Sequence, residues 1–351
     1  MTELARIIAA RVAATGPLTL ADYMAECLLH PEHGYYTTRT PFGAAGDFTT
    51  APEISQMFGE LLGLSLAQAW LDQGAPAPFT LAELGPGRGT LMADVLRATR
   101  SVPGFHAAAQ VVLLEASAAL RAQQGARLAP HPITHANQID ALPDQPLFLL
   151  ANEFFDALPI HQFHYDGTAW RERLVGLQNG QLAFGLSEPL HPDTALPAFE
   201  NPTPGRVVEV CPAARPYAAV IHDRIQRHGG AALIVDYGGW RSSGDTFQAL
   251  RHHAFADPLA TPGEADLTAH VDFEALAAFC ALPHAYCEQG GFLTRLGIDA
   301  RAARLAQSLT GPALQSHLAA HRRLTHPDEM GSLFKVLGLH RPGTPLPPGL
   351  A

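Results

Sequence analysis

The sequence predicts an α/β fold built on a mostly parallel sheet, and two observations support it. Short apolar runs alternate with helical patterns along the middle of the chain, which is the rhythm of βαβ units. The chain has 351 residues, 47% of them hydrophobic and 16% charged, which is enough apolar material for one large core or two smaller ones. The expected strands are 79–84, 111–115, 146–151 and 231–236, and the helices between them include 91–99 and 116–127.

The other elements follow in order along the chain. Residues 1–75 are expected to form an N-terminal helical cap with a loop at 31–52 and a long helix at 53–70. Asp166-Gly167 and Asn179-Gly180 are hairpin turn dipeptides, so they predict an antiparallel hairpin insertion. The remaining expected segments are a core over 76–340 with insertions at about 160–205 and 240–282, C-terminal helical insertions at 271–281 and 299–323, a last strand at 333–339 and a tail at 341–351.

Charge and hydropathy limit the partners and the compartment. The formal net charge is 23 − 33 = −10, which repels polyanions and argues against nucleic acid as the main partner. No apolar stretch approaches the roughly 18 residues of a membrane span, so no membrane insertion is expected. The spacing of Ile7, Ile8 and Val12 indicates a packed first helix rather than an import sequence. These features predict a cytoplasmic protein.

Cysteines and histidines do not indicate a metal centre. The four cysteines, Cys27, Cys211, Cys280 and Cys287, have neither metal-type spacing nor the pattern of a disulfide framework, which indicates a reducing compartment. The 18 histidines include close pairs, but no pair has a clustered carboxylate or cysteine beside it. No metal site is therefore predicted.

A glycine-rich turn joins the strand at 79–84 to the helix at 91–99. Gly85, Gly87 and Gly89 let the backbone approach a ligand closely and present amide donors at a helix N-terminus. The pattern is G-x-G-x-G with Glu83 two residues before it, whereas a dinucleotide fingerprint is G-x-G-x-x-G. A carboxylate there repels a pyrophosphate but can bind an ammonium group. The predicted ligand is S-adenosylmethionine.

A second carboxylate supports this cofactor. Glu115 ends the next strand, 115 − 83 = 32 residues after Glu83, which is about one βαβ repeat. From that position it can accept hydrogen bonds from both hydroxyls of a ribose. Either feature alone also fits an ordinary turn or strand end, but their order along the chain predicts a nucleoside cofactor site.

Further motifs are spread over nearly the whole chain. They lie at 23–24, 33–36, 46–56, 58–60, 83–89, 152–159, 235–238, 266–273 and 334–337. In these segments the chain resembles the MidA-like methyltransferases, an S-adenosylmethionine-dependent family that includes a mitochondrial protein arginine methyltransferase acting in respiratory complex I assembly. The resemblance implies a class I methyltransferase (Rossmann-like) fold.

The resemblance also implies roles for residues outside the glycine turn. Gly46, Asp47, Phe48 and Thr49 are expected to contact the cofactor from a loop that closes over it as a lid, with an ordinary surface loop as the alternative. Asn137 stands where the family commonly has Asp after the third strand, and it can still make a polar contact to the adenine amino group. A second departure is Leu250, which lacks an aromatic hydroxyl that the family pattern would place there.

Polar residues follow the strand at 146–151, and ligands lie beyond strand ends in open α/β sheets. Glu153 and Asp156 can form paired hydrogen bonds with a guanidinium and orient one nitrogen, with Asn152 beside them. Asp236 is a further candidate acid at the same edge. The alternatives are that Asn152 and Asp156 only cap turns or helices, and that Asp236 only satisfies backbone amides.

Together these features predict an S-adenosylmethionine-dependent methyltransferase that acts on a protein arginine. The implied partner is a protein with an accessible arginine, with a respiratory complex I subunit as a candidate. A small-molecule methyltransferase and a cofactor-binding assembly chaperone without turnover are the alternatives. The complete glycine turn, Glu115 and the cluster at 152–156 favour an active enzyme over a chaperone. The sequence does not predict the oligomeric state.

Overall fold

A computed structural model describes residues 2–38, 50–191 and 202–350 of the chain. Contacts separate these residues into two units. The first unit contains 2–38, 156–191, 202–215 and 241–272, and the second contains 50–155, 216–240 and 273–350. A separate cluster of buried apolar side chains forms the core of each unit.

The second unit is built on a mostly parallel sheet. Its strands are β2 (Phe79–Leu84), β3 (Ala109–Leu114), β4 (Ile133–Ala136), β5 (Leu147–Asn152), β10 (Gly230–Gly239), β15 (His284–Glu288) and β16 (Phe334–His340). They lie in the order β15-β16-β10-β5-β2-β3-β4, parallel from β10 to β4 and antiparallel where β16 pairs with β10 and β15. The predicted α/β fold with a mostly parallel sheet is confirmed.

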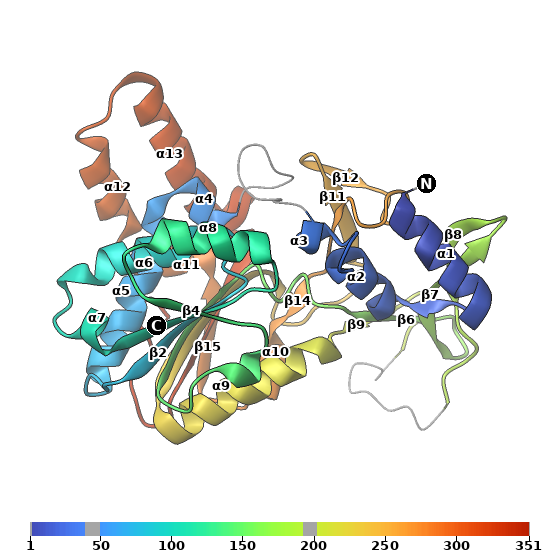
Figure 1. Ribbon diagram of the computed structural model, residues 1–351, viewed down its shortest axis with the longest axis horizontal. Helices are drawn as coiled ribbons and strands as arrows, with labels where there is room; N and C mark the ends of the chain where they lie inside the picture. The colour runs from blue at the N-terminus through green and yellow to red at the C-terminus, as the bar shows by residue number, and fades with distance from the viewer. Residues whose placement is uncertain (1, 39–49, 192–201, 351) are drawn as a thin grey trace. The chain divides into compact units, whose positions relative to one another are not determined.

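Helices cover this sheet, and every residue of β2 and β5 is buried, as expected for parallel strands with both faces covered. Figure 1 shows α6 and α8 along one side of the strands and α9 along the other. The helices are α4 (Ala51–Ile54), α5 (Gln56–Asp72), α6 (Thr90–Ala98), α7 (Phe105–Ala108), α8 (Ala118–Leu128), α9 (Arg215–His228), α10 (Phe273–Cys280), α11 (Gln289–Arg295), α12 (Ile298–Ala306) and α13 (Gly311–Thr325).

Two glycines let α5 lie close to α6. A Cβ atom at Gly59 would be 2.7 Å from Asp94 Cβ, and one at Gly63 would be 2.9 Å from Val95 Cα. Both separations are far shorter than a van der Waals contact, so a larger side chain would push the helices apart. This close packing explains why the apolar pattern of α5 contains glycine in its interior.

Two helices that the sequence predicts as continuous are each divided in two. Ser55 is extended, with φ −158°, and its Oγ accepts a hydrogen bond from the Met57 N–H at 3.3 Å, so it caps α5 and separates it from α4. The predicted helix at 299–323 is interrupted between Ala306, where α12 ends, and Gly311, where α13 begins with a φ of +55° and with Pro312 in its first turn. The first break comes from a capping serine, and the second lies next to a glycine–proline pair, both inside an otherwise helical periodicity.

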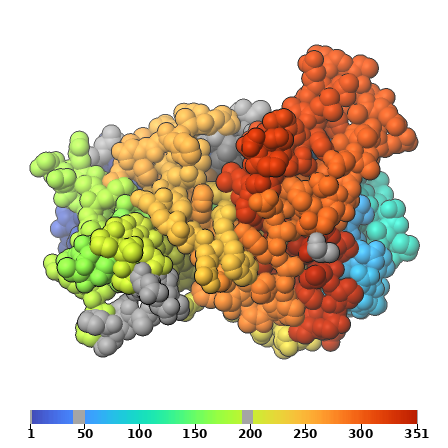
Figure 2. All heavy atoms as spheres, turned by 180° about the vertical axis from the view of Figure 1, so that it is seen from behind, coloured from blue at the N-terminus to red at the C-terminus, as the bar shows by residue number. Residues whose placement is uncertain are grey.

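The C-terminal residues pack against the second unit. Leu350 is 5% exposed and belongs to its core, and Ser65 Oγ donates a hydrogen bond to Pro348 O at 2.8 Å. Figure 2 shows the last residues, in dark red, against the rest of this unit. The proline-rich tail is therefore held by contacts with the core rather than by its own secondary structure.

The first unit combines antiparallel strands with three N-terminal helices. One sheet has the order β1-β7-β6-β9 with β8 beside β7, and another has the order β12-β11-β13. The predicted hairpin turn at Asn179-Gly180 is confirmed, since both residues have positive φ values of 53° and 78°. The elements are α1 (Glu3–Thr15), β1 (Leu18–Thr19), α2 (Leu20–Leu29), α3 (Tyr35–Thr38), β6 (His161–Tyr165), β7 (Trp170–Gln178), β8 (Gln181–Leu186), β9 (Val207–Val210), β11 (Gln248–Arg251), β12 (Ala254–Ala256) and β13 (Asp266–Thr268).

Each unit is built from several separate segments of the chain, and the division expected at residue 75 stays a prediction. Helix α5 packs against α6 and β10, so it belongs with the sheet of the second unit. Helix α1 buries Leu4, Ile8 and Val12 in the core of the first unit, which confirms a packed first helix. The strands of both expected insertions, at 160–205 and 240–282, contribute to that same first unit.

Candidate active site

The strand order of the second unit reverses at β2. The chain passes outward from β2 to β3 and β4, then returns to β5 on the other side of β2. Ligands in open α/β sheets bind beyond the carboxyl ends of the strands at such a point. The glycine turn follows β2, Glu115 follows β3, Asn137 follows β4 and Glu153 follows β5. The structure thus brings four predicted site segments to one edge of the sheet.

The turn requires glycine for steric reasons. Gly85, Gly87 and Gly89 have φ values of 60°, 50° and 76°, in the left-handed region that favours glycine. A Cβ atom at Gly85 would lie 2.9 Å from the ring of Phe154. The N–H of Gly85 donates to Leu114 O at 3.1 Å, which ties the turn to the end of β3.

Glu83 is a buried acid beside this turn. It is 3% exposed, and its Oε2 has no hydrogen-bond partner among the residues that the structure describes. The pKa of its carboxyl is raised to about 8. Burial is the main cause, the hydrogen bond from the Met92 N–H opposes it, and the charge of Glu115 adds to it. A buried carboxylate oxygen without a partner costs free energy unless a ligand satisfies it. The ammonium group of the predicted cofactor can supply the hydrogen-bond donor that this oxygen lacks.

Glu115 and Asn137 are held at the ends of neighbouring strands. Glu115 Oε1 accepts the Ser117 N–H at 2.8 Å, and its Oε2 accepts Gln124 Nε2 at 3.3 Å. Burial raises the pKa of Glu115, although these hydrogen bonds act in the opposite direction. The Arg121 guanidinium donates to the carbonyl oxygen of Glu115 and to Asn137 Oδ1. Arg121 therefore holds together Glu115 and Asn137, the two residues predicted to contact the nucleoside, at the same edge of the sheet.

Gln124 is a site residue that the sequence did not predict. It is fully buried on α8, where its Nε2 donates to Gly87 O at 2.7 Å and its Oε1 accepts from His135 Nε2 at 2.8 Å. Burial and the charge of Arg121 lower the pKa of His135, so the neutral ring serves as the donor. Gln124 thus links the glycine turn to Glu115. A single glutamine in an amphipathic helix gives no motif by which it could have been found.

Glu53 of α4 is a second missed residue at the turn. Its Oε1 accepts Thr90 Oγ1 at 2.5 Å and Arg88 Nε at 3.3 Å, and its Oε2 pairs with the same guanidinium. Thr90 Oγ1 in turn accepts from the Arg127 guanidinium at 2.6 Å. The sequence pattern marks Glu53 only as the start of a helix. Its one signal is membership of the segment 46–56 that carries the family resemblance.

Glu153 adopts an unusual backbone conformation. Its φ is +51°, and its N–H donates to Val235 O at 2.9 Å. Its Oε1 accepts the Ala51 N–H at 3.1 Å and Asn152 Nδ2 at 3.0 Å. Asn152 is buried, and its Oδ1 has no hydrogen-bond partner within the described ranges. A strained non-glycine residue fixed by its surroundings is a recurrent feature of functional sites.

Asp236 supports the segment that carries Glu153. It is fully buried, and its Oδ2 accepts the N–H groups of Phe154 at 3.2 Å and Phe155 at 3.0 Å. Its Oδ1 accepts the N–H of Tyr237 at 2.9 Å. These bonds are the backbone-satisfying role given above as the alternative, and a catalytic role for Asp236 stays a prediction.

Asp156 belongs to the first unit, where it lies in a buried polar cluster. Its carbonyl oxygen accepts the Ala269 N–H at 3.0 Å. Tyr36 donates to Asp266 Oδ1 at 2.7 Å, and burial, with the charges of Asp266 and Asp156, raises the pKa of Tyr36 well above its usual range. Asp156 is thus placed with Tyr36 and Asp266.

The predicted lid residues Gly46, Asp47, Phe48 and Thr49 lie outside the described residues. Their contacts with the cofactor stay a prediction. Thr50, the first described residue after them, is buried and precedes α4 as its N-cap.

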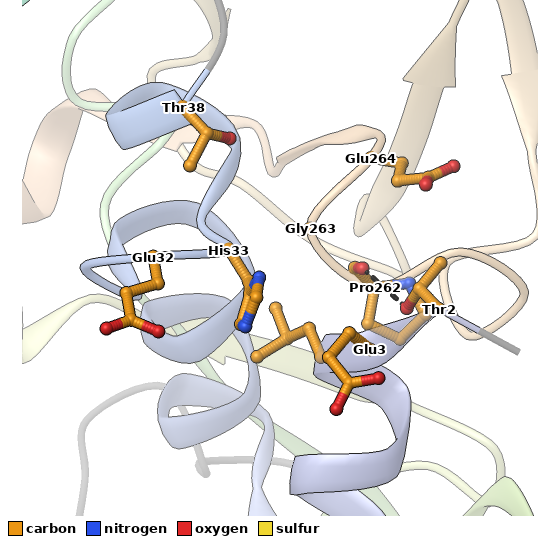
Figure 3. Close-up of a pocket in the computed structure, with 9 residues that line it drawn as sticks. Thr2, Glu3, Glu32, His33, Thr38, Pro262, Gly263 and Glu264 are labelled. Atoms are coloured by element: carbon orange, nitrogen blue, oxygen red, sulfur yellow. Dashed lines mark hydrogen bonds between the residues drawn. The ribbon is translucent and has the colours of Figure 1, made fainter.

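A pocket of about 190 Å³ lies in the first unit (Figure 3). It is lined by Thr2, Glu3, Leu4, Glu32, His33, Thr38, Pro262, Gly263 and Glu264. None of these is a predicted site residue, so the pocket plays no part in the proposed chemistry. Within the described parts of the chain, no group of three or more His, Cys, Asp or Glu side chains could hold a metal ion.

Comparisons with known proteins identify relatives over almost the full chain. A family model described as an S-adenosyl-L-methionine-dependent methyltransferase matches residues 61–287. The Drosophila melanogaster protein arginine methyltransferase NDUFAF7 homolog, mitochondrial, is 35% identical over 372 residues, which cover 96% of this chain and 84% of the relative. The Bos taurus protein arginine methyltransferase NDUFAF7, mitochondrial, is 36% identical over 370 residues, which cover 97% and 83%.

Solved structures agree with these relatives. A Burkholderia thailandensis crystal structure bound to S-adenosyl-homocysteine has a TM-score of 0.82 at 26% identity and covers 99% of this chain and 92% of its own. A native structure from the same organism has a TM-score of 0.80 at 26% identity, with the same coverage. Together with the family model, these matches confirm S-adenosylmethionine as the cofactor, which the buried Glu83 oxygen and the left-handed glycines fit.

The prediction of a cytoplasmic location is wrong. The relatives from Drosophila melanogaster and Bos taurus, which align with at least 96% of this chain, are named as mitochondrial proteins. The four cysteines are free thiols, but a reducing environment is common to more than one compartment, so cysteine usage could not identify it.

In the described part of the chain, the helices are too short or too polar to cross a membrane.

The family model covers 61–287, which is more than half of the chain, and the curated relatives exceed 30% identity over nearly all of it. The resemblance drawn from the sequence motifs is confirmed. The chain belongs to the MidA-like family of S-adenosylmethionine-dependent methyltransferases.

Proposed function

We propose that this methyltransferase transfers a methyl group to an arginine side chain of a protein. The observation that carries the proposal is the position of Glu153, a residue with a positive φ at the end of β5 whose carboxylate Oε1 accepts hydrogen bonds from Ala51 and Asn152. A fixed carboxylate can form paired hydrogen bonds with a planar guanidinium. The relatives named as protein arginine methyltransferases support the same substrate class.

In this proposal the edge of the second unit holds the cofactor. Glu83 binds the ammonium group, the backbone of Gly85, Gly87 and Gly89 lies against the ligand, and Glu115 accepts the ribose hydroxyls. The buried, partnerless Glu83 oxygen and the left-handed glycines support these roles. Asn137 remains the predicted contact for the adenine amino group.

Glu153 also controls a proton. When bound, S-adenosylmethionine supplies a methyl group on a positively charged sulfur. A guanidinium nitrogen that gains this carbon must lose a proton, because the side chain otherwise carries two positive charges. Glu153 accepts that proton and orients the nitrogen, while the amide of Asn152 holds the carboxylate in place. Help from Asp156 stays part of the proposal.

The identity of the acceptor can be tested with labelled cofactor. The protein is incubated with S-adenosylmethionine labelled in the methyl group and a soluble extract, and macromolecules are then separated from small molecules. We expect label in a discrete protein band, and a respiratory complex I subunit stays the candidate implied by the resemblance. Label confined to the small-molecule fraction would replace the arginine proposal with the small-molecule alternative.

Binding of the cofactor is expected to release a proton from Glu83. The pKa of Glu83 is about 8 in the ligand-free chain, so the carboxyl is mostly protonated at about pH 7. An ammonium ligand favours the ionised form, and binding should therefore release up to about one proton at this pH and progressively less above pH 8. Calorimetry in buffers of different ionisation enthalpy measures this number directly.

Two variants define the control for this measurement. Glu83→Gln removes the titrating group, and its binding should release no such proton. Glu60 is also a buried acid of the second unit, but it pairs with Arg97 and Arg301 away from the glycine turn, so Glu60→Gln should release as many protons as the parent. Equal proton release by the parent and Glu83→Gln would contradict the role of Glu83.

A further inference from the structure

We propose that Glu53 is a positioning residue that holds the glycine turn and Glu153 in register with each other through α4. One end of this short helix is bonded to Glu153, and a side chain two residues later is bonded to the turn. The proposal rests on the assignment of the cofactor to this turn. It concerns two residues, Glu53 and Arg88, that lie in recognised motifs but to which the motifs assign no individual role.

The first contact fixes the glycine turn from outside. Arg88 stands between Gly87 and Gly89, two glycines with positive φ values. Glu53 binds its guanidinium with both carboxylate oxygens and also accepts the hydroxyl of Thr90, the first residue of α6. Paired, charge-assisted hydrogen bonds of this kind restrict orientation as well as distance. The Glu53 carboxylate therefore anchors both the turn and the start of the following helix.

The second contact fixes Glu153. The Ala51 N–H donates to Glu153 Oε1 at 3.1 Å, and Ala51 is itself fully buried. The N–H of Glu53 donates to Thr50 O at 2.9 Å, which closes the helical turn, and Pro52 restricts the backbone between the two contacts. A movement of Glu53 should thus reach Ala51, which lies two residues earlier in the same helical turn.

Electrostatics make the Glu53 contact strong. Burial opposes ionisation of Glu53, but the hydrogen bonds from Arg88 and Thr90 and the charges of Arg88 and Arg127 outweigh it, so its pKa lies below the usual value. The side chain of Glu53 is 12% exposed. A charge pair at this depth costs more when one partner is lost than a surface pair does.

The Glu53–Arg88 pair also keeps the charge of the turn compatible with a cationic ligand. S-adenosylmethionine carries a sulfonium and an ammonium, so an uncompensated cation on the turn would repel it. Glu53 neutralises Arg88 and directs its guanidinium toward α4. Without Glu53, the turn would gain both freedom of movement and a positive charge beside its ligand.

The experiment compares cofactor binding by four variants of the full chain. Glu53→Gln and Arg88→Met each remove one partner, and the double variant Glu53→Gln/Arg88→Met removes both. Glu60→Gln is the matched control, because Glu60 is a buried carboxylate of the adjoining helix α5 that binds Arg301 at 2.7 and 2.9 Å without contacting the turn. Calorimetry gives the dissociation constant of S-adenosylmethionine, thermal unfolding gives stability, and amide exchange reports on residues 50–55 and 85–90.

We expect Glu53→Gln to weaken cofactor binding by about tenfold or more, the scale of one hydrogen bond to a charged group. Amide exchange should rise in both segments, 50–55 and 85–90. The double variant should bind no more weakly than Glu53→Gln alone, since the two side chains act as one unit. Glu60→Gln should lower the unfolding temperature but leave binding unchanged.

The possible outcomes separate the two proposals. Parent-like binding by Glu53→Gln, equal weakening by Glu60→Gln, or additive effects of the two substitutions would each overturn the positioning role. Increased exchange limited to 85–90 would overturn the link to Glu153. Failure of the parent to bind S-adenosylmethionine would instead contradict the proposed function, whatever the variants do.

Discussion

Replacing Glu153 by Gln should slow methyl transfer by about a hundredfold or more while leaving cofactor affinity nearly unchanged, the usual scale for loss of a general base. The amide keeps the size of the side chain and an oxygen that can accept the Ala51 N–H at 3.1 Å, so the segment after β5 should keep its conformation. What the variant loses is the charge that grips a guanidinium and receives its proton. Single-turnover rates and calorimetric binding constants measure the two quantities separately.

A second variant separates charge from position. Glu153→Asp keeps the charge but withdraws it by one methylene group, so it should transfer methyl groups faster than Glu153→Gln and more slowly than the parent. Unfolding temperatures close to that of the parent are expected for both variants. Full activity of Glu153→Gln would show that another group receives the proton.

Replacing Gly87 by Val should abolish measurable binding of S-adenosylmethionine. Gly87 has a φ of +50°, its carbonyl oxygen is held by Gln124, and its backbone is proposed to lie against the ligand. A branched side chain would both strain this backbone and occupy the space of the ligand. Calorimetry with the folded variant checks the expectation.

Gly74 provides the matched control for strain. Its φ is +82°, and a Cβ atom there would have no heavy atom within 4 Å. Gly74→Val therefore carries a comparable backbone penalty in open space and should bind the cofactor like the parent. Binding by Gly87→Val, or its loss in Gly74→Val to the same degree, would contradict the assignment of the glycine turn.

Much of the sheet could be predicted because its signals are local. Four of the six residues at 79–84 are apolar, and the run forms β2 with the expected bounds. Glycine at alternate positions after a strand likewise indicated the turn without any tertiary information. In contrast, β11, β12 and β13 have only three or four residues each, too few for a periodicity to be recognised.

The partners of the site residues could not be predicted, because they come from distant segments. Glu53 meets Arg88, and Gln124 meets Gly87 and His135, only after α4, α8 and β4 have packed around the turn. For Asp236, the sequence predicted the position but not the hydrogen-bond partners. Its position after an apolar run indicated an acid at the sheet edge, but only the structure shows that it accepts three backbone N–H groups.

The most direct measurement is the location of the transferred methyl group by mass spectrometry. A protein acceptor methylated by the parent enzyme is digested, the modified peptide is sequenced, and an acid hydrolysate is examined for methylated amino acids. We expect the added mass on an arginine, methylarginine in the hydrolysate, and at least about a hundredfold less of both at equal time with Glu153→Gln. A methyl group found on another side chain, or only on a small metabolite, would contradict arginine methylation by this chain.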